Sequence, residues 1–200
     1  MLQFAVFSLV NYLLGSIPFA LVIGKVFYHT DVRQFGSGNL GATNTGRVLG
    51  KLPAYLVAFL DGSKGLIAYL IETAINPQAA LFASIFVVVG HCWPVFAGFK
   101  GGKGVATTCG IIVAISLASW KMLLLCAVIP GICWYLISHF TEYVSLASLF
   151  SLLLSAVLST FATDNIYITL VFTLLLLLVT YRHRENISRL INGTESKKNY

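Results

Sequence analysis

Charged residues are scarce in this chain of 200 residues. Asp, Glu, Lys and Arg make up 10% of the sequence, whereas 58% of the residues are hydrophobic. Soluble domains carry about 25% charged residues, so the sequence lacks the polar surface that a fold in water needs. The apolar residues also form long blocks without the spacing of amphipathic helices. Both features exclude a soluble globular domain and predict an integral membrane protein.

Several signatures of catalysis and ligand binding are missing as well. The sequence contains no C-x-x-C pair, no metal-ligand cluster at a recognised spacing, no paired carboxylates and no G-x-S-x-G motif. The acyltransferase dyad H-x-x-x-x-D is absent, because Phe96 follows His91 and Ser188 follows His183 at that distance. We therefore expect no metal, no cofactor and no obvious general base.

Seven apolar segments divide the chain. They cover residues 2–27, 53–74, 79–97, 105–117, 122–137, 144–162 and 166–181. A spanning helix needs about 20 apolar residues, so the fourth and fifth segments are marginal and five crossings are the alternative. No internal repeat or soluble domain is visible. We expect an all-α integral membrane fold, a polytopic bundle of about seven transmembrane helices that forms a single domain over residues 1–200.

The placement of basic residues predicts the orientation of this bundle. With seven crossings and the N-terminus outside, only Lys121 falls on the outer side. The inner side receives Lys25, Arg33, Arg47, Lys51, Lys100, Lys103, Arg182, Arg184, Arg189, Lys197 and Lys198. By the positive-inside rule this side is cytoplasmic, which predicts a multi-pass protein of the cell membrane with its C-terminus and its polar loops in the cytoplasm.

The first polar loop, "FGSGNLGATNTGR", contains G-x-G-x-x-G. A dinucleotide fingerprint needs a preceding strand and a soluble βαβ unit, whereas a membrane helix precedes this loop and Asp61 lies inside the next one. Glycines still let backbone N–H groups converge on an anion, and Arg47 supplies a planar charged fork. The alternative is an ordinary flexible turn. The candidate phosphate-binding residues are Ser37, Gly38, Asn39, Gly41, Thr43, Asn44 and Arg47.

The second polar loop, "FKGGKGVAT", places lysines among glycines in the same way. It is not a Walker A loop, because Gly104 follows Lys103 where that motif requires Ser or Thr. Two lysines on the inner face could serve as topology markers only. Their position among three glycines favours an oxyanion-binding loop. Its candidate residues are Lys100, Gly101, Gly102, Lys103, Gly104 and Thr107.

Ionisable residues inside membrane segments are functional candidates. His91 precedes the second loop, and Asp61 and Lys64 share a helix face at i, i+3, where they can pair. Lys64 is equally a candidate for substrate binding and for a structural ion pair. Glu72 lies near the outer end of the same segment and is expected to be solvated.

The tail "YRHRENISR" adds His183 and Asn186, again at i, i+3. A basic tail next to a membrane helix is most often an anchor for anionic lipid, which is the alternative here.

Taken together, these motifs resemble the bacterial acyl-phosphate:glycerol-3-phosphate acyltransferases. The matching stretches are "GSGNLGATN" (36–44), "DGSKG" (61–65), "GHCWPVFAGFKGGKGVAT" (90–107) and "YRHRENI" (181–187). The resemblance implies transfer of a long-chain acyl group from acyl phosphate to the 1-hydroxyl of glycerol 3-phosphate. The products are lysophosphatidic acid and phosphate, in the first step of phospholipid synthesis.

The resemblance also implies partners and residue roles. The partners are glycerol 3-phosphate, long-chain acyl phosphate, the lipid bilayer and, functionally, an enzyme that forms the acyl phosphate; nucleic acid is not among them. Ser37, Arg47, His91, Lys103 and His183 are the expected catalytic residues. The other loop residues, with Lys64 and Asn186, are expected to bind substrate. The competing hypothesis is a small-anion transporter with phosphate-binding loops, which predicts repeat symmetry that the sequence does not show.

Overall fold

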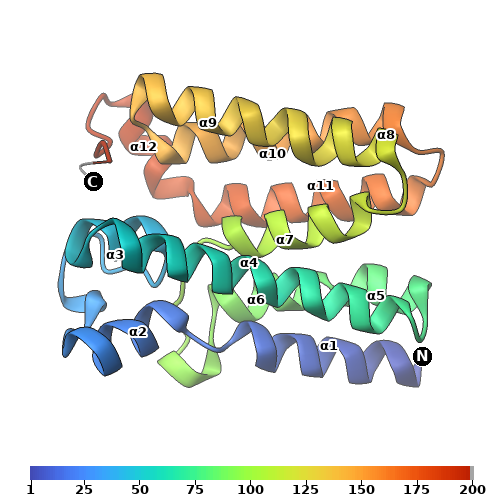
Figure 1. Ribbon diagram of the computed structural model, residues 1–200, viewed down its shortest axis with the longest axis horizontal. Helices are drawn as coiled ribbons and strands as arrows, with labels where there is room; N and C mark the ends of the chain where they lie inside the picture. Colours follow the sequence, from blue (N-terminus) through green and yellow to red (C-terminus); the bar gives the residue numbers. More distant parts are fainter. Residues whose placement is uncertain (199–200) are drawn as a thin grey trace. The chain divides into compact units, whose positions relative to one another are not determined.

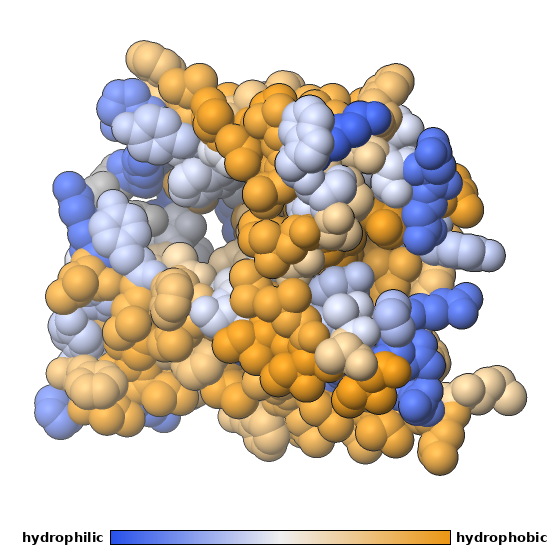
Figure 2. All heavy atoms as spheres, turned by 45° about the vertical axis from the view of Figure 1, so that its right-hand side comes forward, coloured by the Kyte–Doolittle hydropathy of each residue, from blue (hydrophilic) through white to orange (hydrophobic). Residues whose placement is uncertain are grey.

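The computed structural model describes residues 1–198, and all the regular structure in them is helical. The chain divides into two compact units, Met1–Ile111 and Ile112–Lys198 (Figure 1). Hydrophobic residues cover most of the face shown in Figure 2. The all-helical membrane fold that the sequence predicts is therefore confirmed. A single domain stays a prediction.

The first unit holds both polar loops. Its helices are α1 (Leu2–Gly15), α2 (Phe19–Tyr28), η1 (Val32–Gln34), α3 (Ala42–Leu49), α4 (Lys51–Thr73), α5 (Pro77–Ala83), α6 (Ile85–Cys92), η2 (Val95–Ala97) and the first part of α7 (Val105–Ser116). α1 packs against α5 and α6, and α3 packs against the start of α4. In Figure 1, α3 and the end of α2 lie at one end of this unit and the N-terminus lies at the other.

A small apolar core supports the polar end of the first unit. Its buried members come from α2, η1, α4, η2 and the segment before α3, and they are Ala20, Ile23, Val32, Leu40, Val57 and Ala97. The polar loops therefore rest on packed side chains at the end of the helices, where a binding site needs a rigid base.

The second unit follows from the end of α7 to the C-terminal part of the chain. After the end of α7 it contains α8 (Trp120–Met122), the π-helical segment η3 (Leu123–Val128), α9 (Ile129–Thr141), α10 (Val144–Ala162), α11 (Ile166–Arg182) and α12 (Arg184–Ile191). α10 packs against α9 and α11. α11 and α12 meet at a bend of 64°.

The side chain of Ser155 on α10 supplies a hydrogen bond to the irregular π-helical segment η3. Pro130 has no N–H for the carbonyl of Cys126, four residues earlier. The hydroxyl of Ser155 donates to that carbonyl at 2.7 Å. A backbone carbonyl inside a membrane needs such a donor because water is absent. This bond explains how the π-helical segment is tolerated.

Within residues 1–198, five helical segments are long and apolar enough to cross a membrane, and a sixth is obtained if α11 and α12 form one span. The five are Leu2–Tyr28, Lys51–Thr73, Pro77–Ala97, Trp120–Thr141 and Val144–Ala162. The expected segment at 122–137 is thus longer than the sequence indicated. The segment at 105–117 forms a helix of 12 residues, Val105–Ser116. Seven crossings and their orientation stay a prediction.

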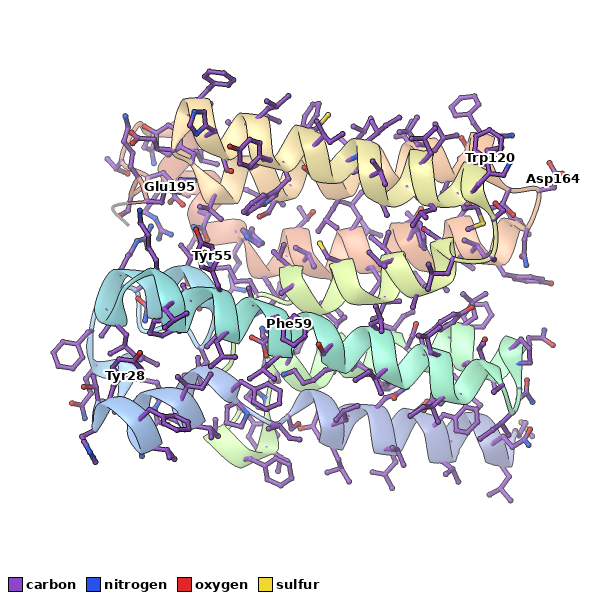
Figure 3. All side chains as sticks on the ribbon, in the orientation of Figure 1. Tyr28, Tyr55, Phe59, Trp120, Asp164 and Glu195 are labelled. Carbon is purple, nitrogen blue, oxygen red and sulfur yellow. The ribbon has the colours of Figure 1, made fainter. Side chains whose placement is uncertain are left out.

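Asparagine side chains cap the starts of two helices. Asn76 caps α5, because its side-chain oxygen accepts from the N–H of Ala79 and Pro77 occupies the first turn. Asn165 caps α11 in the same way. Aromatic side chains such as Tyr28, Phe59 and Trp120 are exposed on the helix surfaces (Figure 3), as expected for surfaces that meet lipid and its interface.

Candidate active site

The first glycine-rich loop is held by one buried amide. Gly36 and Gly38 have positive φ angles, 60° and 68°, which a glycine adopts without strain. The side-chain oxygen of Asn44 accepts from the N–H of Ser37 at 2.8 Å. Its amide donates to the carbonyls of Val32 and Phe35 at 2.9 and 3.2 Å. Asn44 therefore shapes the loop from beneath, and its expected contact with substrate stays a prediction.

The other polar groups of this loop lie toward its surface. Ser37 is exposed, Asn39 and Thr43 are half-buried, and the amide of Asn39 donates to the hydroxyl of Ser37 at 3.3 Å. α3 starts directly after Gly41, so Thr43 lies in its first turn and half-buried Arg47 one turn later. First-turn N–H groups have no partner within the helix and attract anions. The loop can thus offer backbone, hydroxyl and guanidinium donors together.

The second glycine-rich loop folds back on His91. Gly98, Phe99 and Gly104 have positive φ angles of 63°, 61° and 83°, so the chain turns sharply before α7. The N–H of Gly102 donates to the carbonyl of His91 at 3.1 Å. Gly101, Gly102, Gly104 and Thr107 are buried, Lys103 is half-buried and Lys100 is exposed. The glycines of this loop are therefore packed inside, whereas Lys100 is exposed and Lys103 is half-buried.

The two loops meet at Gly102. A Cβ atom built there would collide with Nε2 of His91 and would lie 2.8 Å from the carbonyl oxygen of Leu40 in the first loop. Only glycine permits this approach. The structure therefore brings together two loops that are about sixty residues apart in the sequence, with the imidazole of His91 against their junction.

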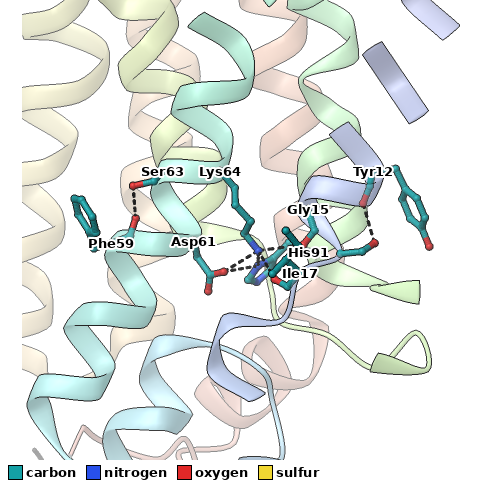
Figure 4. A network of polar contacts seen from close by, with 9 residues as sticks. Tyr12, Gly15, Ile17, Phe59, Asp61, Ser63, Lys64 and His91 are labelled. Atoms are coloured by element: carbon teal, nitrogen blue, oxygen red, sulfur yellow. Dashed lines mark hydrogen bonds and ion pairs between the residues drawn. The ribbon is translucent and has the colours of Figure 1, made fainter. Parts of the chain in front are cut away.

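Asp61 and Lys64 form the predicted ion pair, beneath the two loops. Lys64 Nζ lies 2.8 Å from Asp61 Oδ1, and both side chains are almost fully buried. Lys64 also donates to the carbonyls of Gly15 and Ile17, each at 3.0 Å. His91 Nδ1 lies 3.5 Å from both Lys64 Nζ and Asp61 Oδ1. Figure 4 shows the two α4 side chains pointing toward His91 and the end of α1.

This geometry limits what Lys64 can bind. An ammonium has three N–H groups, and three protein oxygens already lie within 3.0 Å of the nitrogen. The Asp61 contact is an ion pair by distance, although Asp61 Oδ1 accepts no well-aligned hydrogen bond within residues 1–198. The three N–H groups of Lys64 are therefore directed at oxygens of the protein itself.

His183 and Asn186 lie in the second unit, at the bend between α11 and α12. His183 Nδ1 lies 2.8 Å from the carbonyl of Val179. Because a carbonyl only accepts, this nitrogen carries the proton. Both side chains are buried. Their role in catalysis and substrate binding stays a prediction.

The tail holds Asn186 through a carboxylate that the sequence did not indicate. Glu195 accepts from Asn186, Ser145 and Arg189 at 2.6, 2.7 and 2.8 Å, and Figure 3 labels it at the end of this unit. Burial alone would raise the pKa of Glu195, but these bonds outweigh it and hold the pKa below its ordinary value. The tail stretch "YRHRENISR" gave no indication of this carboxylate, and its contact with Ser145 joins residues 50 positions apart.

The expectation that Glu72 is solvated is wrong. Glu72 is 5% exposed, and the amide of Asn11 donates to its carboxylate at 2.9 Å. Asn11 lies in the apolar run of α1, where position in the sequence gave no sign of a partner for Glu72.

Among residues 1–198, no three His, Cys, Asp or Glu side chains converge as a metal site would require.

Known proteins match this chain over nearly its full length. A family model described as Glycerol-3-phosphate acyltransferase matches residues 5–193. The chain is 40% identical over 193 residues to a glycerol-3-phosphate acyltransferase 2 of Bacillus cereus, covering 96% of this chain and 93% of that protein. It is 42% identical over 194 residues to glycerol-3-phosphate acyltransferase of Listeria monocytogenes, covering 95% and 94%.

Two solved structures have the same fold. They are crystal structures of PlsY, described as an integral membrane glycerol 3-phosphate acyltransferase, in a glycerol 3-phosphate form and a lysophosphatidic acid form. Their TM-scores are 0.88 and 0.86 at 38% identity, and each match covers 97% of this chain and 94% of that chain. Sequence and fold therefore agree over the whole length, and this chain belongs to the glycerol-3-phosphate acyltransferase family of integral membrane enzymes.

Proposed function

We propose that this enzyme transfers the acyl group of a long-chain acyl phosphate to the 1-hydroxyl of glycerol 3-phosphate. The products are 1-acylglycerol 3-phosphate (lysophosphatidic acid) and inorganic phosphate. The observation that carries the proposal is the junction of two glycine-rich basic loops at Gly102 and Leu40. Two substrates that each carry a phosphate need two sets of anion donors close together. The family accounts for the acceptor, and PlsY has glycerol 3-phosphate and lysophosphatidic acid forms.

The loop residues divide into anchoring and binding groups. Ser37, Arg47 and Lys103 would contact the phosphates, and the imidazole of His91, at the junction of the loops, would donate to substrate oxygens. The N–H of Gly102 donates to His91, so other backbone N–H groups of the second loop would complete the cradle around one phosphate. Further contacts would come from Gly38, Asn39, Gly41, Thr43, Lys100 and Thr107.

The reaction needs alignment more than it needs a strong base. The 1-hydroxyl oxygen attacks the acyl carbonyl carbon, forming a C–O ester bond while the C–O bond to phosphate breaks. The hydroxyl proton passes to a substrate phosphate oxygen, and the electron pair of the broken bond leaves with inorganic phosphate. Positive groups near the carbonyl stabilise the charge that develops on its oxygen, and holding both anions in place removes much of the entropic barrier.

Acyl phosphate suits these loops better than an acyl thioester does. Its leaving group is itself the anion that the loops are built to bind, so the donors that hold the substrate also stabilise the leaving phosphate. The acyl chain would lie among the helices, in contact with lipid. The predicted seven-span topology, with an outer N-terminus, would place the loops on the cytoplasmic face of a bacterial cell membrane, where soluble glycerol 3-phosphate is available.

The test is phosphate release by purified protein supplied with palmitoyl phosphate and glycerol 3-phosphate, without added metal or coenzyme A. Release that depends on glycerol 3-phosphate and yields lysophosphatidic acid is the expected result. Activity with an acyl thioester alone would refute the proposed donor. Flux of glycerol 3-phosphate into liposomes, without acyl transfer from either donor, would favour the transporter instead.

A further inference from the structure

We propose that Asp61 and Lys64 are positioning residues that set the affinity of the second glycine-rich loop for a phosphate substrate without touching that substrate. The loop's binding role comes from the proposed function, so this inference rests on it. The positioning is transmitted through the break between α1 and α2 and through His91. Each link is a short contact within the first unit.

The first link is the broken span. α1 ends at Gly15 and α2 begins at Phe19, so carbonyls at the break lose partners that a continuous helix would provide. Lys64 donates to two of them, those of Gly15 and Ile17. A cation is favoured at a helix C-terminus, and carbonyls away from water need a donor. Lys64 therefore fixes the geometry of the break.

The break in turn holds the chain on the far side of His91. The hydroxyl of Tyr12 donates to the carbonyl of Trp93 at 3.0 Å, and the hydroxyl of Ser16 accepts from the N–H of Val95 at 3.3 Å. These two bonds fasten the segment that leads from α6 into the second loop. A shift at the break would move the start of this loop.

The second link is the imidazole. On one edge, His91 Nδ1 lies 3.5 Å from both members of the ion pair. On the other edge, Nε2 adjoins Gly102, whose N–H donates to the carbonyl of His91. The ring is 7% exposed, so it has little room to move independently. Asp61 balances the charge of Lys64, and together they fix the inner edge of a ring whose outer edge supports the loop.

The first unit contains a natural control for this idea. Asn11 and Glu72 form a second buried polar contact between the same two helices, α1 and α4. Glu72 lies eight residues beyond Lys64, about 12 Å along the helix, and its contact has no link to either loop. Loss of this contact should destabilise the same interface without moving the loop.

The experiment compares three variants with the wild type. In the first, Asp61→Asn and Lys64→Met are combined so that no lone buried charge remains. The second is Lys64→Arg, which keeps the cation, and the third is the control Glu72→Met, which removes the acceptor for Asn11. Thermal unfolding gives the stability of each variant, steady-state kinetics gives kcat and KM for both substrates, and calorimetry gives the Kd of glycerol 3-phosphate.

The expected result is a split between affinity and stability. The charge-free pair variant should raise KM for one phosphate substrate about tenfold, and Lys64→Arg, made in the wild type, should raise that KM much less. Glu72→Met should lower Tm while leaving both KM values and the Kd unchanged. A purely structural role would reduce the amount of folded enzyme, which lowers apparent kcat but leaves KM unaffected.

Two outcomes would overturn the inference. In the first, the folded pair variant keeps wild-type KM values for both substrates. In the second, Glu72→Met weakens binding as much as the pair variant does. Failure of the proposed donor is a different result, because it appears in the wild type as transfer from a thioester only. The comparison of KM values is then made with that donor.

Discussion

Substitution of Gly102 by alanine should disable the junction of the two loops without unfolding the protein. The added Cβ would collide with Nε2 of His91 and lie 2.8 Å from the carbonyl oxygen of Leu40, against an ordinary contact of at least 3.4 Å. Backbone must therefore move by at least about 0.6 Å on the Leu40 side, and the imidazole side requires more. The total displacement therefore exceeds about 1 Å, which is enough to cost roughly 10²-fold in rate when reacting groups are misaligned.

That factor corresponds to about 2.7 kcal/mol of transition-state stabilisation. We expect kcat/KM for acyl transfer to fall by about this amount, while the far-UV circular dichroism spectrum stays that of the wild type. Gly131→Ala is the matched control, because a Cβ atom there meets nothing within 4 Å and α9 gains a better helix former. Wild-type kcat/KM in a folded Gly102→Ala variant would show that the loops do not act as one site.

Three further predictions concern a cation, a carboxylate and a hydroxyl. Lys103→Ala should lower kcat about 10²-fold, the scale of one lost electrostatic donor, whereas Lys121→Ala should not; equal losses in steady-state assays would remove Lys103 from the site. The folded-state pKa of Glu195 lies below its ordinary 4.5, so its stabilisation is present above pH 4.5 and is lost as the pH falls through the folded value. Tm should therefore drop in acid, and Glu195→Gln should abolish the part of this drop that Glu195 contributes. Ser155→Ala should cost about 1–3 kcal/mol in the free energy of unfolding unless Pro130→Ala restores an N–H for Cys126; additive losses would contradict that account.

Local sequence patterns predicted local features well. Each of the seven apolar segments that hydropathy located contains helix, because a membrane helix must be apolar along its whole length. How many of them cross the membrane stays a prediction. The i, i+3 spacing of Asp61 and Lys64 predicted their ion pair correctly. In each case the interacting groups lie within one turn of each other, and the sequence contains the full interaction.

Contacts between distant segments were not predictable in the same way. Glu72 was expected in solvent because its position along α4 is terminal, but Asn11 meets it from 61 residues away. The sequence suggested substrate binding for Asn44, and the structure shows its amide occupied by the loop backbone. A polar residue in a loop looks the same in the sequence whether it supports the loop or binds the ligand. Only the direction of its hydrogen bonds separates the two roles.

The position of Lys64 illustrates why a membrane enzyme places buried charged residues near its active site. A phosphate cradle requires irregular backbone, and irregular backbone below the membrane surface leaves carbonyls without water. A buried cation can satisfy several carbonyls at once, but its charge then needs a partner such as Asp61. A loop that rests on a side chain packed against that pair, as the second loop rests on His91, inherits its fixed geometry. In this protein the loop is the one that carries Lys103, so the residues that make the broken span tolerable in lipid also hold the candidate phosphate-binding loop in place.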